Sequence, residues 1–375
     1  MAVLVIAAGV VVVIGRVTLS PAGRGPQQIL DALVSGPQRV APGATAYVTG
    51  PNGTWVGAAG IANIKTGQRM RPDARLRIQS NSKTWLLAVA LQLMQEGKLN
   101  FADTVSRWLP GLLPHGNQIN LLELMTDTSG LIDDNDVLAT PSAGNEMLSR
   151  VKNAKLRAEL RATAGRLAAS PATPVSPMWF IRLAAWQPLL FTPGTRYHHS
   201  NIGWNIAGLI VARAAGQSLP ALYRERIFKP LGLTHTTYAP QGPIPGPHAE
   251  GYLIARSGRL SDTTDWTFGK GADGAIVTDA TDEATFLHAL LDNELGVREA
   301  FLAFVHPTGW KPAKGGCPGN PNEGTGAGDA SRSYVYYSTT GSNRIAVLLV
   351  NGKRAVTGAD EPEAEAAAAS LYCGA

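Results

Sequence analysis

Several features that mark large classes of protein are missing from this chain of 375 residues. No run of Lys and Arg is interleaved with aromatic residues, and the formal net charge is only +5, so nucleic-acid binding has little support. There is no Gly-rich phosphate loop, and no Gly-x-Ser-x-Gly elbow of the kind an α/β-hydrolase esterase needs. The seven histidines are scattered, and His198-His199 lacks the i, i+4 spacing of a zinc helix. We therefore expect no metal and no other cofactor.

Cysteine is also scarce, with only Cys317 and Cys373 in the whole chain. In an exported protein an even pair is most simply a disulfide, which here would tie the terminal helix to the loop before the last strands. Two free buried thiols are the alternative, and the spacing does not decide between them.

Long apolar runs are absent apart from residues 2–14. This run is short for a bilayer span but typical of the hydrophobic region of a signal peptide, and Ser20-Pro21-Ala22 supplies small residues for cleavage. Since no Lys or Arg precedes the run, an uncleaved membrane anchor or a misplaced start codon stays open. Residues 1–22 are predicted to be a signal peptide or signal anchor, which places the protein outside the cytoplasm, secreted or associated with the cell envelope.

The remaining composition, 45% hydrophobic and 16% charged, is ample for a core. Short β-prone runs at 44–49 and 54–57 flank an Asn-Gly turn and predict a hairpin. Strand character returns at 333–337 and 344–350, and residues 362–372 predict a terminal helix. We expect an α+β fold, in which N- and C-terminal helices pack on an antiparallel sheet.

The middle of the chain reads as helices broken by Pro and Gly, at 121–125, 145–167 and 202–215. Within it, residues 154–169 are rich in Ala, Arg and Leu and predict a surface helix. One domain is expected over residues 23–375. Its sheet part comprises about 23–105 and 266–375, and its all-helical insertion about 106–265.

One helix carries candidate chemistry in its first turn. Apolar residues from Trp85 to Met94 cover all sides of the helix, so it should be buried. Ser80 and Lys83 are three residues apart and share one face. A lysine in a partly desolvated pocket can activate a serine hydroxyl as a nucleophile. Taken alone, the pair is more simply an N-cap and a solvated lysine.

Several sequence motifs follow Ser80 in the order in which one enzyme family has them. Leu-Met-Thr-Asp-Thr-Ser-Gly-Leu at 124–131 is similar to the Leu-Leu-Thr-His-Thr-Ser-Gly-Leu segment of the penicillin-recognising serine hydrolases, which include class C β-lactamases, D-alanyl-D-alanine carboxypeptidases and related esterases. Pro-Gly-Thr-Arg-Tyr-His-His-Ser-Asn-Ile-Gly at 193–203 resembles their Pro-Gly…Tyr-Ser-Asn-x-Gly segment. Further landmarks lie at 228–233, 251–252 and 274–282. The resemblance covers about residues 40–373 and implies a β-lactamase/transpeptidase-like fold.

What the resemblance implies is acyl transfer. Ser80 would attack a carbonyl, with Lys83 beside it as base or electrostatic support. The backbone N–H groups of Ser80 and Ala327 would hold the oxyanion. Asn201 would hydrogen-bond both Lys83 and the substrate amide. The secreted carboxypeptidases are similar in one more respect, because they end in a helix whose Cys pairs with one before the last sheet motif.

The second motif departs from the family pattern. The family tyrosine that shuttles the proton is His199 here. Histidine can accept a proton at pH 7, so we expect His199 to be the general base. The hydroxyl of Tyr197 is an alternative that would require a rearrangement of the loop.

The third motif, Lys-Thr-Gly or His-Thr-Gly in the family, is best matched by Gly324-Thr325-Gly326, with Thr308-Gly309 after His306 as a competing match. At Gly324 there is no cation to attract a substrate carboxylate, which weakens the case for a free D-alanine terminus. Arg332 would substitute if it pointed inward, but a solvated charge on a half-exposed strand is the expectation. Thr325 would still donate a hydrogen bond to the substrate.

Two functions remain open from the sequence. The first is an exported serine hydrolase, a monomer that acts through an acyl-serine intermediate on a D-alanyl-D-alanine-like peptide, an amide or an ester. The second is a catalytically impaired protein of this fold with a binding or scaffold role, because both the second and the third motif are altered.

Overall fold

The computed structural model describes residues 25–36, 39–138, 140–170, 172–240, 243–266, 271–305, 321–328, 330–339, 343–354 and 362–374. The predicted leader, Cys317 and the competing match at His306 to Gly309 lie outside these residues. The leader and the disulfide between Cys317 and Cys373 therefore stay predictions.

The largest sheet joins the two ends of the chain. Its strand order is β3-β2-β1-β11-β10-β9, and every pairing in it is antiparallel. The strands are β1 (Gly43–Gly50), β2 (Gly53–Asn63), β3 (Gln68–Arg69), β9 (Asn322–Ala327), β10 (Arg332–Tyr337) and β11 (Ile345–Val350). The Asn-Gly turn between β1 and β2 confirms the predicted hairpin. The late strands are confirmed as β10 and β11. Strand β11 pairs with β1, which joins the N-terminal hairpin to the C-terminal strands in one sheet.

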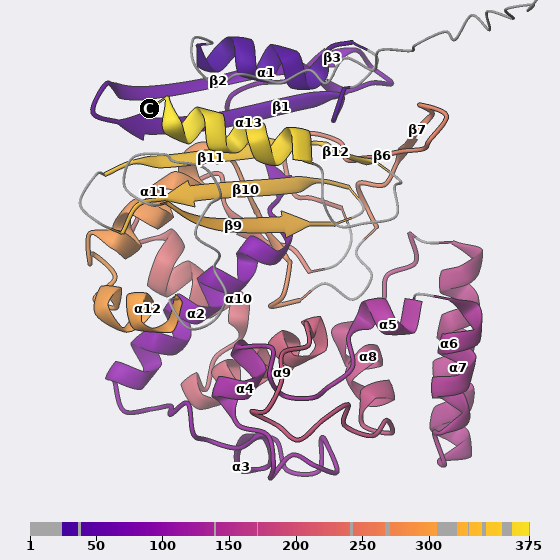
Figure 1. Cartoon of the computed structure of the whole chain (residues 1–375). Coiled ribbons are helices and arrows are strands. Elements are labelled where there is room, and N and C mark those ends of the chain that lie inside the picture. Colours follow the sequence, from indigo (N-terminus) through magenta and orange to yellow (C-terminus); the bar gives the residue numbers. More distant parts are fainter. Residues whose placement is uncertain are drawn as a thin grey trace, which may run out of the picture.

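Helices cover both faces of this sheet (Figure 1). On one face lie α1 (Pro26–Val34) and α13 (Pro362–Cys373), which pack with Tyr334, Leu348 and other alternate strand residues in a small core. On the other face, Val335 and Val347 belong to the main core with α2 (Ser82–Gln95) and α11 (Ala280–Leu291). This alternation of inward residues produces the predicted α+β architecture, with terminal helices on an antiparallel sheet.

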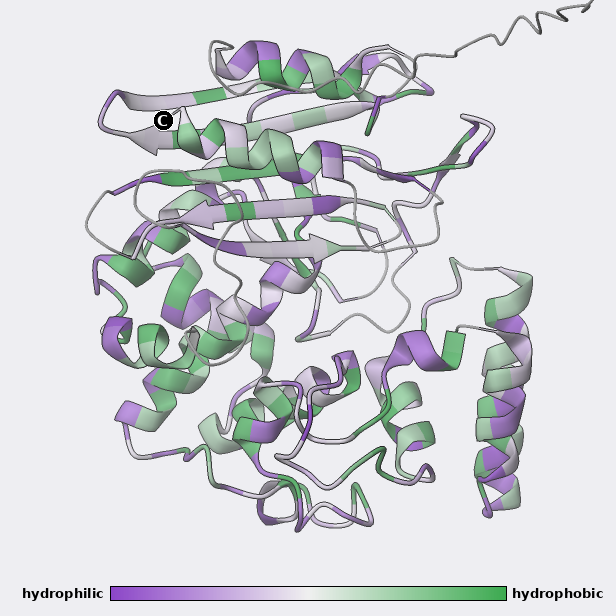
Figure 2. Ribbon diagram, viewed as in Figure 1, coloured by the Kyte–Doolittle hydropathy of each residue, from purple (hydrophilic) through white to green (hydrophobic). Residues whose placement is uncertain are grey.

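The helical part lies below the sheet in the view of Figure 1. Its helices are α3 (Val105–Trp108), α4 (Leu121–Met125), α5 (Asp134–Leu138), α6 (Pro141–Ser149), α7 (Ala154–Ala169), α8 (Pro177–Ala184), α9 (Asn201–Ala215) and α10 (Leu219–Tyr223), followed by a π-helical turn at Arg224–Phe228. The helical run predicted at 145–167 is divided between α6 and α7, because Asn153 starts a new helix by accepting a hydrogen bond from the backbone N–H of Leu156. The predicted surface helix is confirmed as α7, whose hydrophilic and hydrophobic residues alternate along the outer edge of the molecule (Figure 2).

Short strands complete the fold, partly inside the interval 106–265 that was expected to be helical. Two small sheets have the orders β4-β8-β5 and β12-β6-β7. Their strands are β4 (Leu76–Arg77), β5 (Thr237–Tyr238), β6 (Tyr252–Ile254), β7 (Leu260–Asp262), β8 (Ile276–Thr278) and β12 (Gly352–Arg354), and the remaining helix is α12 (Arg298–Val305). The first of these sheets matters for function, because β4 leads directly into the turn that carries Ser80.

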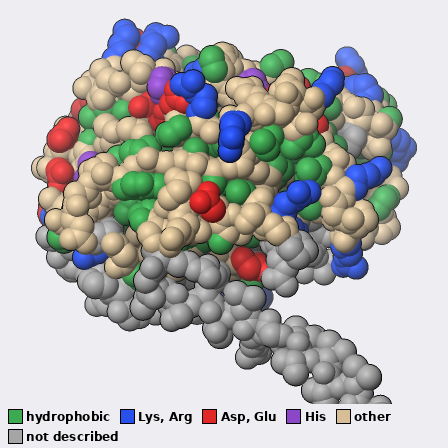
Figure 3. Space-filling view, turned by 90° about the horizontal axis from the view of Figure 1, so that it is seen from above, with side chains coloured by type: hydrophobic (Ala, Val, Ile, Leu, Met, Phe, Trp, Pro, Cys, Tyr) green, Lys and Arg blue, Asp and Glu red, His purple; other side chains and the backbone are tan. Residues whose placement is uncertain are grey.

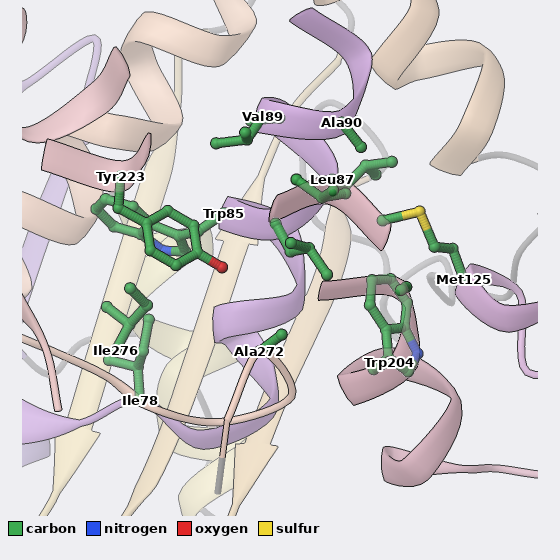
Figure 4. Packing of buried hydrophobic residues seen from close by; sticks show 14 of the residues in the cluster. Ile78, Trp85, Leu87, Val89, Ala90, Met125, Trp204, Tyr223, Ala272 and Ile276 are labelled. Atoms are coloured by element: carbon green, nitrogen blue, oxygen red, sulfur yellow. The ribbon is translucent and has the colours of Figure 1, made fainter. Parts of the chain in front are cut away.

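Helix α2 runs through the centre of the main core and is buried on all sides, as predicted (Figure 4). Trp85 is fully buried and stacks on Phe286 of α11 with ring centroids 3.9 Å apart. The opposite side of α2 packs near Met125 of α4 and Trp204 of α9 (Figure 4). Because losing a buried aromatic side chain typically costs about 3–5 kcal/mol, the position of the first turn of α2 is strongly fixed.

The face seen from above shows hydrophobic areas between uncharged groups, with Lys and Arg side chains scattered singly over it (Figure 3). Within the described residues, no helix combines the length and the apolar character that a bilayer span needs.

Candidate active site

Ser80 lies on a tight 3-10 turn, Gln79–Asn81, between β4 and α2. Ser333 of β10 and Ser331, directly before this strand, hold this turn. Ser333 Oγ donates to the Ile78 carbonyl at 2.6 Å and accepts from Asn81 Nδ2 at 2.8 Å. Ser331 Oγ donates to the carbonyl of Arg77 at 2.7 Å. These contacts fix the backbone of the turn that carries Ser80, and Ser80 itself is half-buried.

Gln79, directly before Ser80, has a left-handed backbone with φ of 53°. A non-glycine residue in this region stores strain of about 1–3 kcal/mol unless its surroundings hold it there. The side chain of Gln79 is buried, and its Nε2 donates to Ser331 Oγ at 3.1 Å. The sharp turn that carries Ser80 is therefore maintained by the same serine that holds the carbonyl group of Arg77.

Lys83 connects Ser80 to the second motif. Its Nζ lies 2.9 Å from Ser80 Oγ and 2.8 Å from Oδ1 of Asn201. The ammonium also lies 5.9 Å from the ring centroid of Trp204, within range of a cation–π interaction. The structure thus brings together Ser80, Lys83 and Asn201.

Asn201 is the first residue of α9, where helix-capping interactions fix it. Ser200 caps the helix by accepting from the backbone N–H of Gly203 at 3.1 Å. The backbone N–H of Asn201 donates to Asp133 Oδ1 at 2.7 Å, a favourable place for a carboxylate. Its side-chain Nδ2 donates to Asp134 Oδ1 at 2.9 Å. Because Asp134 takes the amide nitrogen, the amide oxygen of Asn201 faces Lys83.

His199 is half-buried, and its Nδ1 lies 3.2 Å from Oδ2 of Asp133. Burial alone would raise the pKa of Asp133. Hydrogen bonding with His199 and Asp134, together with the charge of His199, outweighs burial and holds the pKa of Asp133 well below its ordinary value. Among the described residues, the hydrogen-bond partner of Ser80 Oγ is Lys83 rather than His199. The neighbouring His198 forms a separate pair with Asp136, 3.0 Å from Nε2 to Oδ2.

Asp127 joins the two loops that border the site and also has a left-handed backbone, with φ of 56°. Its Oδ1 accepts from the backbone N–H of Ser200 and from Nε1 of Trp204, each at 3.2 Å. Burial raises the pKa of Asp127, although the nearby Lys83 and His199 oppose that change. Asp127 therefore fixes the position of Trp204, the residue whose ring lies within cation–π range of Lys83.

Tyr197, the alternative proton carrier, is 66% exposed. It lines a groove of about 1150 Å³ with Thr126, Thr128 and apolar side chains of α2 and α12. Partial burial of its hydroxyl and the carboxylates of Asp127 and Asp133 raise its pKa, which makes the phenolate harder to form. Tyr197 thus lies largely in solvent at this groove, whereas Lys83 hydrogen-bonds Ser80 and Asn201.

The third-motif match, Gly324-Thr325-Gly326, lies on β9 at the edge of the main sheet, next to the turn of Ser80. Gly326 is required there because a Cβ at this position would overlap the carbonyl oxygen of Ile78. Thr325 and Ala327 are exposed on the same strand. The motif is thus beside the nucleophile candidate, as predicted, while the roles of Thr325 and Ala327 stay predictions.

Arg332 does not replace the missing cation, and the expectation of a solvated charge is also wrong. Its side chain is only 4% exposed. Ser331 and Ser333, its neighbours in the chain, point toward the turn of Ser80, so the alternation of extended backbone places Arg332 on the opposite face. No cation of the third motif or of Arg332 therefore faces the site.

Asp133 and Asp134, which hold His199 and Asn201, were not predicted from the sequence. The available signal was the run Asp-Asp-Asn-Asp at 133–136, directly after the landmark at 124–131. Within the described part of the chain, no group of three or more His, Cys, Asp or Glu side chains is arranged to hold a metal ion.

The chain is similar to known proteins in sequence and in fold. The beta-lactamase family model matches residues 27–370. A solved structure of a D-stereospecific amidohydrolase from Streptomyces sp. has a TM-score of 0.71 at 23% identity, covering 93% of this chain and 98% of the other. A penicillin binding protein from Bacillus halodurans has a TM-score of 0.70 at 20% identity, covering 93% and 100%. These likenesses show the fold.

Among curated proteins, Protein flp of Staphylococcus aureus (strain MRSA252) is 26% identical over 183 residues, which are 48% of this chain and 31% of the relative. The match thus spans about a third of the length of that relative.

Proposed function

Because the chain belongs to the beta-lactamase family, we propose that it is an exported serine hydrolase that acts through an acyl-Ser80 intermediate. The substrate class is a peptide, an amide or an ester. The observation that carries this proposal is the contact of Lys83 Nζ with both Ser80 Oγ, at 2.9 Å, and Asn201 Oδ1, at 2.8 Å. A nucleophile, its lysine and an orienting amide converge in one half-buried place.

In the proposed acylation, Ser80 Oγ forms a bond to the carbonyl carbon of the substrate. The proton of Ser80 passes to Nε2 of His199, which then delivers it to the leaving nitrogen or oxygen as its bond to the carbonyl carbon breaks. Lys83 stays beside Ser80 Oγ and stabilises the negative charge that develops on it. Apo geometry need not already contain the Ser80–His199 contact, because such hydrogen bonds often tighten only with substrate bound.

Deacylation follows the same route with water in place of the leaving group. The water oxygen bonds to the acyl carbon while its proton moves to His199 Nε2. The bond from Ser80 Oγ to the acyl carbon then breaks, and the proton returns to Ser80. The backbone N–H groups of Ser80 and Ala327 are proposed to hold the oxyanion in both steps.

The charges of the site support a preference among substrates. Gly324 brings no cation to the edge strand, Arg332 faces away, and Asp127, Asp133 and Asp134 all lie near His199 or Asn201. We therefore propose that amides and esters without a free carboxylate beside the scissile bond react faster than peptides ending in D-alanine.

The second candidate, a binding protein without turnover, is favoured by the altered second and third motifs. A panel of acyl donors separates the two. The protein and its Ser80→Ala variant are incubated with a fluorescent penicillin, a fluorophosphonate, a D-amino acid amide, a D-alanyl-D-alanine peptide and p-nitrophenyl esters, with Ser149→Ala, an exposed serine on α6, as matched control.

We expect turnover of an ester or amide and covalent labelling that Ser80→Ala abolishes and Ser149→Ala preserves. Absence of both labelling and turnover across the panel would reject the hydrolase and leave the binding protein.

A further inference from the structure

Besides its hydrogen bond with Asp134, Asp133 contacts three hydrogen-bond donors in a buried place. Its Oδ1 accepts from the backbone N–H of Asn201 at 2.7 Å. Its Oδ2 lies 3.2 Å from Nδ1 of His199 and 2.6 Å from Nδ2 of Asn135. The side chain of Asp133 is 5% exposed, so these contacts are largely shielded from water.

We propose that Asp133 is a positioning residue for the proton transfer, because it holds the His199 imidazole with Nδ1 protonated and Nε2 open to the substrate. This inference rests on the proposed function. An ionised carboxylate is only an acceptor, so the hydrogen of His199 must lie on Nδ1. Nε2 then has the lone pair that takes the proton of Ser80, and Asp133 stabilises the imidazolium that forms.

The proton count closes on the named atoms. As the bond from Ser80 Oγ to the acyl carbon forms, one proton moves from Oγ to Nε2 and the ring becomes positively charged. When the bond to the leaving group breaks, that proton leaves Nε2 for the departing nitrogen or oxygen. Asp133 stays ionised throughout and exchanges no proton, since its role is orientation and charge.

Other charged and titratable groups surround the imidazole. Asp127 lies on the loop after α4, and its carboxyl group interacts electrostatically with His199 and with Lys83 of α2. Tyr197 lies two residues before His199 in the chain and Asp134 one residue after Asp133, while His198 pairs with Asp136. Of these groups, Asp133 is the one that hydrogen-bonds the ring of His199.

The chain provides a matched control. His198 and Asp136 repeat the same type of pair at 3.0 Å, but both side chains are about one-third exposed, and neither touches Ser80, Lys83 or Asn201 in the described structure. Asp136 Oδ2 also accepts from the backbone N–H of Asp133 at 2.8 Å, and the side-chain oxygen of an asparagine can still accept there. Asp136→Asn therefore removes the charge beside a neighbouring histidine and keeps an acceptor for the backbone of Asp133.

Asp133→Asn is the informative substitution. Its Oδ1 can still accept the backbone N–H of Asn201, which keeps the helix cap, but its Nδ2 then faces His199 Nδ1 as a donor. That contact favours the tautomer with the hydrogen on Nε2, which cannot accept a proton. We expect kcat to fall by at least about 10²-fold, the lower end of what general acid–base catalysis contributes.

The experiment measures kcat, KM and the pH–rate profile of the full chain and of Asp133→Asn, Asp133→Glu and Asp136→Asn, on the ester that reacts best. We expect the fall in Asp133→Asn to lie in kcat rather than KM, with its acid limb moved to lower pH because the anion that favours the imidazolium is gone. Asp133→Glu should recover part of the loss, and Asp136→Asn should keep kcat close to that of the unchanged chain.

A second measurement is made on the unchanged chain, with a variant used only to assign the signals. In ¹⁵N-histidine-labelled protein, the ring nitrogen shifts of His199, assigned with His199→Phe, should show Nδ1 protonated and Nε2 bare at a pH where the ring is neutral. The Nε2–H tautomer, or an Asp133→Asn variant with unchanged kcat and acid limb, would overturn the role of Asp133. Failure of the proposed function looks different, because the unchanged chain would then have no turnover and no Ser80 adduct.

Discussion

Lys83 Nζ and Asn201 Oδ1 lie 2.8 Å apart although 118 residues separate them in the chain. The same Nζ lies 2.9 Å from Ser80 Oγ, so this contact joins the first motif to the second. Asp134 fixes the amide by accepting from Asn201 Nδ2 at 2.9 Å. The relationship makes Asn201 the residue through which the helical part of the fold orients the lysine.

Removing that amide should cost activity more than stability. Asn201→Ala deprives Lys83 of an acceptor and Asp134 of a donor, and a hydrogen bond to a charged group contributes about 1.5–3 kcal/mol. We expect kcat/KM to fall by about 10- to 100-fold. Asn205→Ala, one turn further along α9, is the control and should leave the steady-state kinetics nearly unchanged. Equal losses in both variants would mean that the effect comes from α9 as a whole.

His199 should impose an acid limb on the rate, because protonation of its ring removes the proton acceptor. His199→Phe should remove this limb and lower kcat by at least about 10²-fold. His198→Phe, at the neighbouring position, should keep both the limb and the rate. A pH–rate profile of the three proteins on one ester provides the test, and full activity in His199→Phe would exclude this residue as the base.

Gly326 sets the distance between β9 and the turn of Ser80. Gly326→Ala would bring its Cβ into the carbonyl oxygen of Ile78, and overpacking of this kind costs about 1–3 kcal/mol. We expect a lower midpoint in urea unfolding together with slower acylation, since the turn must shift. Thr325→Ala, exposed on the same strand, should leave the midpoint unchanged. A urea midpoint in Gly326→Ala equal to that of the unchanged chain would show that the turn of Ser80 can shift without loss of stability.

Glu283 should make stability depend on pH. Burial raises its pKa to about 8, and the hydrogen bond from Trp85 Nε1 at 3.1 Å only partly opposes this. In the unfolded chain the carboxyl ionises near its ordinary pKa of about 4.3, while in the folded chain it stays protonated. The stability that Glu283 contributes is thus fully present below about pH 4.3 and is lost as the pH rises through about 8.

Glu283→Gln keeps an acceptor for Trp85 and removes the titration. We expect its free energy of unfolding to change less between about pH 5 and pH 8 than that of the unchanged chain. Urea unfolding at both pH values measures this, with Glu159→Gln, exposed on α7, as control. Equal pH dependence in Glu283→Gln and the unchanged chain would contradict a neutral Glu283.

The sequence was sufficient for features that depend on local spacing. The hairpin at the Asn-Gly turn, the buried helix after Ser80 and the strand partners β10 and β11 follow from periodicity and turn chemistry, and each is present. Ser80, Lys83 and Asn201 were identified from ordered landmarks, and they meet in space.

Features that depend on tertiary contacts could not be predicted. The role of Asp133 appears only when the loop before α5 meets the start of α9, and a run of carboxylates in sequence gives no sign of its partners. Arg332 was expected to be solvated, because sequence alone does not show that β10 is covered on both faces. The break between α6 and α7 depends on the cap at Asn153, a local interaction that outweighed helical propensity.

The central claim is that Ser80 carries the acyl group during turnover. The most direct test quenches the protein with acid during steady-state hydrolysis of a reactive ester and locates the added mass by tandem mass spectrometry of its peptides. We expect the acyl group on Ser80, and neither an adduct nor turnover in Ser80→Ala. Turnover without an adduct on Ser80, or full turnover by Ser80→Ala, would contradict the account.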